Sequence, residues 1–127
     1  MTATLPTTVA VWAGVVLVGG VGSVLRLLVD RAVARRVARP FPFGTLTVNI
    51  SGAALLGLIG GLALSREAAL LADTAFLGAF TTFSTWMLES HRLGEERRMG
   101  TAIANVVVSV VLGIGAALLG QRIAMQL

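Results

Sequence analysis

Residues 78 to 86 read Gly78-Ala79-Phe80-Thr81-Thr82-Phe83-Ser84-Thr85-Trp86 and lie near the middle of an apolar stretch. Asp73 and Glu89 bracket this stretch, and lipid resists charge at depth, so we expect a membrane span over about residues 73–90. Its centre carries four hydroxyls in five residues, preceded by a glycine. Because glycine lacks restraint and hydroxyls compete for backbone hydrogen bonds, this pattern predicts a broken helix whose freed carbonyls line a cavity or hold an ion. The alternative is an unbroken helix whose hydroxyls bond to carbonyls of the preceding turn.

The composition indicates an integral membrane protein. Of 127 residues, 56% are hydrophobic and 13% are charged, and the mean hydropathy is +0.89. Cysteine is absent and the single histidine, His91, lies beside Arg92, so neither a zinc site nor a Ser-His-Asp triad is expected and we predict no enzyme. All ten cationic residues are arginines and the net charge is +4. In a membrane protein this basicity indicates topology and contact with anionic lipid, and nucleic-acid binding is not expected.

Three further apolar stretches complete the chain, which we predict to be one all-α domain over residues 1–127. The expected transmembrane helices are about 8–29, 44–64, 73–90 and 101–121, each close to the 20 residues that cross the hydrocarbon. Small residues recur at helical spacing on the first, second and fourth helices, for example at Ala53, Gly57 and Gly61. Such faces allow close helix approach, and we expect an oligomer because four short helices can hardly enclose a pore.

Several polar residues fall within these helices. Arg26 either reaches the membrane interface or faces a water-filled vestibule. Asn49, which shares a helix face with Thr45, either makes an interhelical hydrogen bond or donates to an anion. Asn105 and Ser109 lie one turn apart and predict a narrow polar track on the fourth helix.

The polar groups at depth favour passive permeation of a small ion. Every acid is expected at or outside a helix end, whereas proton-coupled transporters use a buried carboxylate. Asn49 and Ser84 can donate hydrogen bonds to an anion, and Phe83 and Trp86 can present positive ring edges, with the indole N–H of Trp86 as a further donor. Carbonyls near Gly78 and Thr81 would instead suit a small cation.

These residues together resemble the small fluoride ion channels of the Fluc or CrcB family. The resemblance covers nearly the whole chain, in four segments: Gly19-Gly20-Val21-Gly22-Ser23 with Arg26, Phe43-Gly44-Thr45-Leu46 through Asn49-Ile50-Ser51-Gly52, Gly78 through Thr85, and Asn105 with Ser109. It implies an antiparallel dimer with a broken third helix and two fluoride pores along the subunit interface. It also implies a structural sodium ion on the two-fold axis, held by the carbonyls of Gly78 and Thr81.

The resemblance also implies roles for single residues. Asn49 matches the pore asparagine, Phe83 the first pore phenylalanine, Ser109 part of the polar track, and Arg26 an arginine at the wider end of the pore. Trp86 departs from the family pattern because it replaces the second pore phenylalanine, and we expect some change in conductance.

The distribution of arginine is a second departure from a homodimer with antiparallel subunits. The segments 30–43 and 91–100 hold seven arginines, against Arg66 and Arg122 on the other side. This bias predicts one orientation in the cell (plasma or inner) membrane, with both loops cytoplasmic and both termini outside. The partner is then either a second copy or, as the bias favours, a homologous subunit of opposite orientation.

The expected function is passive, fluoride-selective export that reduces fluoride toxicity. Two other functions remain open, a small four-helix multidrug or cation transporter and a membrane assembly protein without transport. The transporter requires a carboxylate in the first span, and the sequence has none there. In the assembly protein, Asn49 and Asn105 would serve helix packing alone.

Overall fold

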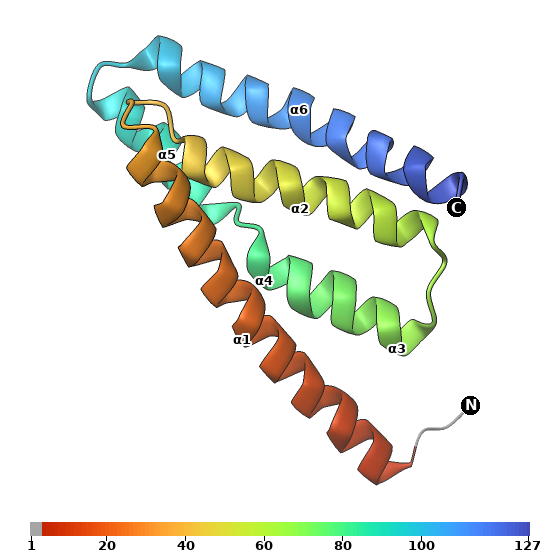
Figure 1. Ribbon diagram of the computed structural model, residues 1–127. Helices are drawn as coiled ribbons and strands as arrows, with labels where there is room; N and C mark the ends of the chain where they lie inside the picture. Colours follow the sequence, from red (N-terminus) through yellow and green to blue (C-terminus); the bar gives the residue numbers. More distant parts are fainter. Residues whose placement is uncertain (1–3) are drawn as a thin grey trace.

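The computed structural model describes residues 4–127, which are all helical or connecting segments without a strand. Four long segments run alternately in opposite directions along the chain (Figure 1). The helices are α1 (Leu5–Arg36), α2 (Phe43–Gly61), α3 (Arg66–Ala69), the π-helix η1 (Leu70–Leu77), α4 (Gly78–Phe80), α5 (Ser84–Glu95) and α6 (Met99–Met125).

Helix α1 is longer than the apolar stretch that predicts it. Thr4 caps its N-terminus by accepting a hydrogen bond from the Thr7 N–H, and a proline stands in the first turn, where its missing N–H leaves no helical bond unmade. The helix continues to Arg36, so the first part of the predicted loop 30–43 belongs to α1. The arginines instead project from the last turns of a continuous helix, which ends before Pro40 because proline cannot continue it.

The third segment differs most from the prediction. It begins earlier than the expected residue 73, because Ser65 caps a helical segment that begins at Arg66 and continues through η1 and α4. Regular helix then stops at Phe80, Thr81 has extended backbone angles (φ −80°, ψ 161°), and α5 begins at Ser84. Asp73 therefore lies inside the segment, in η1, and the expectation that every acid sits at a helix end was wrong.

Glycines allow the long helices to approach one another within this chain. Helices α2 and α6 lie side by side (Figure 1), and a methyl group on Gly57 or Gly120 would collide with a backbone carbonyl of the other helix. Gly22 of α1 approaches the Phe76 carbonyl of η1 in the same way. These small-residue faces are thus occupied inside one subunit, so they are not free surfaces for a second subunit as the sequence led us to expect.

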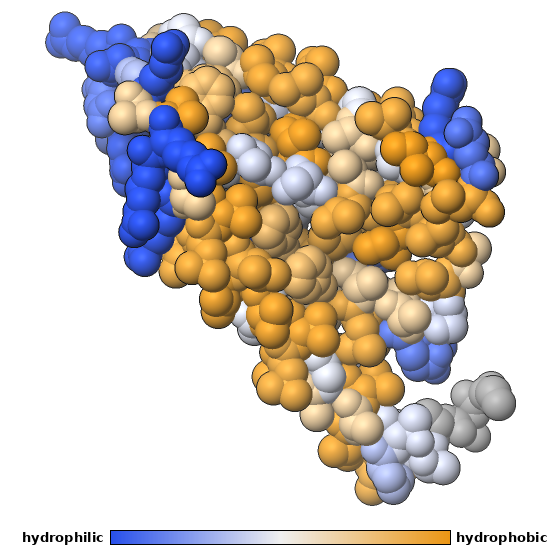
Figure 2. Space-filling model, in the orientation of Figure 1, coloured by the Kyte–Doolittle hydropathy of each residue, from blue (hydrophilic) through white to orange (hydrophobic). Residues whose placement is uncertain are grey.

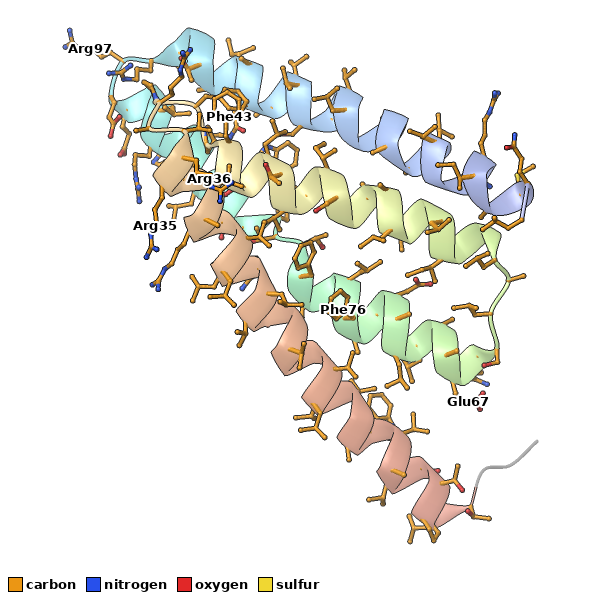
Figure 3. All side chains as sticks on the ribbon, in the orientation of Figure 1. Arg35, Arg36, Phe43, Glu67, Phe76 and Arg97 are labelled. Atoms are coloured by element: carbon orange, nitrogen blue, oxygen red, sulfur yellow. The ribbon has the colours of Figure 1, made fainter. Side chains whose placement is uncertain are left out.

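An apolar belt separates polar ends on the molecular surface (Figure 2). Within residues 4–127, α1, α2 and α6 are long and apolar enough to cross a membrane. The third segment is divided into the shorter elements α3, η1, α4 and α5. Arg35, Arg36 and Arg97 lie together at one end, and Glu67 lies at the other (Figure 3). The fold is therefore that of a multi-pass α-helical membrane protein.

Candidate functional site

The interruption of the third segment is held by Asn49 of α2. Its side-chain N–H donates to the Thr82 carbonyl at 2.9 Å, and its carbonyl oxygen accepts from the Thr82 N–H at 2.8 Å. The Thr82 N–H would otherwise bond to the Gly78 carbonyl in a continuous helix, so this pairing releases that carbonyl. Asn49 thus makes the interhelical hydrogen bonds that the sequence left open, and its second amide N–H stays unused.

Two cavities meet at Thr82, which lines both. The first, here called the Asn49 cavity, has a volume of about 370 Å³ and lies between α2, the third segment and α6. Its lining includes Asn49, Asp73, Gly78, Thr81, Thr82, Phe83, Trp86 and Ser109. The second, here called the Arg26 cavity, has a volume of about 230 Å³ and is lined by Ser23, Arg26, Leu27, Asp30, Thr45, Val48, Thr82 and Thr85. The predicted residues are therefore divided between the two sides of the interruption.

The aromatic residues of the Asn49 cavity contact each other edge to face. The ring centroids of Phe83 and Trp86 are 5.6 Å apart and their planes are inclined by 84°. This arrangement directs the positive edge of one ring toward the negative face of the other. Phe83 is 70% exposed in the single chain.

Trp86 is fixed by a hydrogen-bonded ring between α5 and α6. Its indole N–H donates to the backbone carbonyl of Asn105 at 3.1 Å. The side-chain amide of Asn105 donates to the Ser90 hydroxyl at 2.8 Å, and this hydroxyl donates to the backbone carbonyl of Trp86 at 2.9 Å. The indole N–H is therefore not the free donor that we expected for an anion. Asn105 is fully buried, so it joins the two helices, and the ion-contacting role that we expected for its side chain is not what this geometry shows.

The Arg26 cavity carries the cationic side of the site. Arg26 donates to the Thr81 carbonyl across 3.5 Å, a long hydrogen bond, so its charge lies beside the interruption. Thr45 is buried and donates its hydroxyl to Glu89 of α5. Ser84 is exposed and lines neither cavity.

Sequence reasoning missed three residues around these cavities. Asp73 and Glu89 were treated as span boundaries, and Ser90 was placed at the end of the third span. The apolar pair Leu70 and Leu71 just before Asp73 was the signal that the helix began earlier. A charged side chain can lie inside a span when it faces a polar cavity, which a boundary rule based on charge cannot recognise.

The fold and the site define a polytopic membrane protein with a cavity lined by polar and aromatic residues where regular helix is interrupted. Residues 13–121 match the family model described as CrcB-like protein, Camphor Resistance (CrcB). The chain therefore belongs to the CrcB family.

Its curated relatives include proteins named as fluoride-specific ion channels. The chain is 75% identical over 118 residues to Fluoride-specific ion channel FluC 2 of Mycolicibacterium paratuberculosis, covering 93% of this chain and 97% of that one. It is 71% identical over 124 residues to the FluC 2 protein of Mycobacterium tuberculosis strain H37Rv, covering 98% of each. A FluC 1 protein of Nocardia farcinica is 47% identical over 102 residues, covering 80% of this chain and 72% of that one.

Proposed function

We propose that this protein is a passive, fluoride-selective channel that lets cytoplasmic fluoride leave the cell and so reduces its toxicity. The observation that carries the proposal is the Asn49 clamp on Thr82: Asn49 lines the same cavity as the Phe83 and Trp86 rings, and its second amide N–H has no partner among residues 4–127. Neutral hydrogen fluoride crosses membranes and dissociates inside, which traps the anion. A pore allows the anion to move down its gradient without an energy source.

The proposed recognition replaces the water around a small anion with fixed donors. Asn49 supplies an N–H, Ser109 supplies a buried hydroxyl without a hydrogen-bond partner, and the aromatic rings supply positive edges. A narrow path lined in this way favours fluoride over chloride, because the larger ion does not fit the same donors. Arg26 would attract anions to the other side of the interruption.

The pore is proposed to form in an antiparallel dimer with two pores. The support is the exposure of Phe83, a pore ring that the single chain leaves uncovered. The clustering of Arg35, Arg36 and Arg97 at one end supports a single membrane orientation, with this end cytoplasmic and both termini outside (Figure 3). A homologous subunit of opposite orientation is then the proposed partner. The occurrence of relatives named FluC 1 and FluC 2 is compatible with such pairs.

A structural sodium ion is a further part of the proposal. The residues fit a small cation, because the Gly78 carbonyl is released by the Asn49 clamp and the Thr81 carbonyl lies outside regular helix. Both oxygens are hard ligands of the type that sodium takes. The ion would supply a positive charge between carbonyl dipoles. Arg26 already approaches the Thr81 carbonyl, and this carbonyl must serve both groups if the proposal holds.

Reconstitution into liposomes tests the function. Liposomes loaded with fluoride are diluted into fluoride-free buffer, and a fluoride electrode follows the release. We expect release that needs the protein and is not accompanied by chloride, measured with this chain alone and together with an oppositely oriented relative. If neither preparation releases fluoride faster than empty liposomes, the proposed function is wrong. Labelling of engineered termini from each side tests the orientation, and an even distribution would contradict the heterodimer.

A further inference from the structure

Asp73 is an acid in the wall of the Asn49 cavity. It lies in η1, and its Oδ1 atom is buried without a hydrogen-bond partner in the described chain. The hydroxyl of Ser109, which lines the same cavity, is also buried without a partner, and Ser109 is only 8% exposed. Unpartnered buried oxygens are rare in folded proteins, so this cavity is built to contain a polar occupant.

No cation of the described residues accompanies Asp73 in this cavity. The charges on elements packed against η1 lie elsewhere. Those of α1 begin at Arg26, which lines the other cavity, and continue toward its C-terminus at Asp30, Arg31, Arg35 and Arg36. Arg66 and Glu67 of α3 are exposed at the start of the segment. The faces of α2 and α6 that line the cavity carry only neutral groups. An anion that enters the Asn49 cavity therefore meets a carboxylate with no cationic side chain in the cavity lining, while Arg26 attracts anions on the far side of Thr82. The sodium ion proposed at the Gly78 and Thr81 carbonyls would offset only part of this charge.

We propose that Asp73 limits the occupancy of the Asn49 cavity by anions and thereby sets the rate of permeation. This inference rests on the proposed function, because it concerns the same path. The carboxylate acts by charge alone, so it lowers the occupancy of every monovalent anion, whereas exclusion of chloride depends on the size of the path and on its donors. For an ion about 10 Å from the carboxylate and an effective dielectric constant of roughly 20 to 40, removal of the charge increases occupancy by about four- to fifteenfold.

The test compares fluoride efflux from liposomes that contain wild type, Asp73→Asn or Asp73→Glu. Asp73→Asn keeps the shape and removes the charge, and we expect efflux to be about four- to fifteenfold faster without chloride leak. Asp73→Glu keeps the charge and should remain close to wild type. Glu67→Gln is the matched control, since it makes the same chemical change in the same segment at an exposed position at the far end of the molecule (Figure 3). Its efflux should equal that of wild type.

The two substitutions at Asp73 separate a role of charge from a role in packing. A role in packing would change efflux in both Asp73→Asn and Asp73→Glu, whereas a role of charge changes it in Asp73→Asn alone. If wild type conducts and Asp73→Asn is unchanged or slower, the inference is overturned. A slower variant that also loses its oligomeric state on size-exclusion chromatography would show that Asp73 binds the partner. If neither wild type nor any variant releases fluoride, both the proposed function and this role of Asp73 are wrong.

Discussion

The substitution Asn49→Asp tests whether the clamp on the interrupted helix carries function. It exchanges the amide NH₂ group, with both of its N–H donors, for a carboxylate oxygen and changes the shape of the side chain very little. In the structure the amide nitrogen lies 2.9 Å from the Thr82 carbonyl oxygen, while the side-chain oxygen accepts the Thr82 N–H at 2.8 Å. The variant therefore keeps one of the two hydrogen bonds and places two oxygens against each other.

The expected cost follows from these contacts. A buried carbonyl that loses its hydrogen-bond donor lowers the free energy of unfolding by roughly 1–3 kcal/mol. The new carboxylate also introduces a negative charge into the Asn49 cavity, where it repels an anion. Since about 1.4 kcal/mol corresponds to a tenfold change, we expect fluoride efflux to decrease at least tenfold and the melting temperature in detergent to fall.

Two further variants make the test specific. Asn49→Ala removes both hydrogen bonds without adding charge, so it should lower the melting temperature at least as much while repelling anions less than Asn49→Asp. Ser51→Ala is the control, because the Ser51 hydroxyl bonds only to carbonyls of its own helix. Wild-type efflux and an unchanged melting temperature in Asn49→Asp would refute the reasoning, since the clamp would then support neither the interruption nor the path.

Three other changes have defined outcomes. Trp86→Phe removes the hydrogen bond to the Asn105 carbonyl and should lower stability by about 1 kcal/mol in a denaturant titration, while an aromatic edge remains and fluoride efflux persists. Phe83→Ile removes the exposed ring at the cavity, so efflux should be lost while size-exclusion chromatography shows intact assembly; retained efflux would contradict the role of the ring. Gly120→Val forces a side chain against the Ala54 carbonyl and should separate α2 from α6, giving a lower yield of folded protein than Gly115→Val, where the space is open.

The class of protein and most of the candidate site could be predicted from residue types. The hydroxyl-rich stretch at the middle of the third span indicated where regular helix would stop, and Asn49, Phe83, Trp86 and Ser109 all line one cavity. Such positions are recognisable because side chains that face lipid are normally apolar, so a polar residue or a cluster of aromatic residues within a span indicates a different environment.

The same preference of lipid for apolar side chains explains why the positions of some residues were predicted wrongly. Asp73 was taken as the boundary of a span because a carboxylate facing lipid is costly, and only the folded chain shows that it faces a cavity. The glycines of α1 and α2 indicated close helix contact, but a spacing pattern does not identify which helix makes the contact.

By itself, the sequence determined that this protein crosses the membrane several times as helices, because its apolar stretches have the length of the hydrocarbon and a backbone in lipid must satisfy its own hydrogen bonds. The tertiary structure alone decided how the polar groups are paired. Asn49 bonds to Thr82, the indole N–H of Trp86 bonds to Asn105, and no cationic side chain of residues 4–127 lines the Asn49 cavity with Asp73. These pairings join residues far apart in the chain, and they depend on distances and directions that residue type and spacing do not contain.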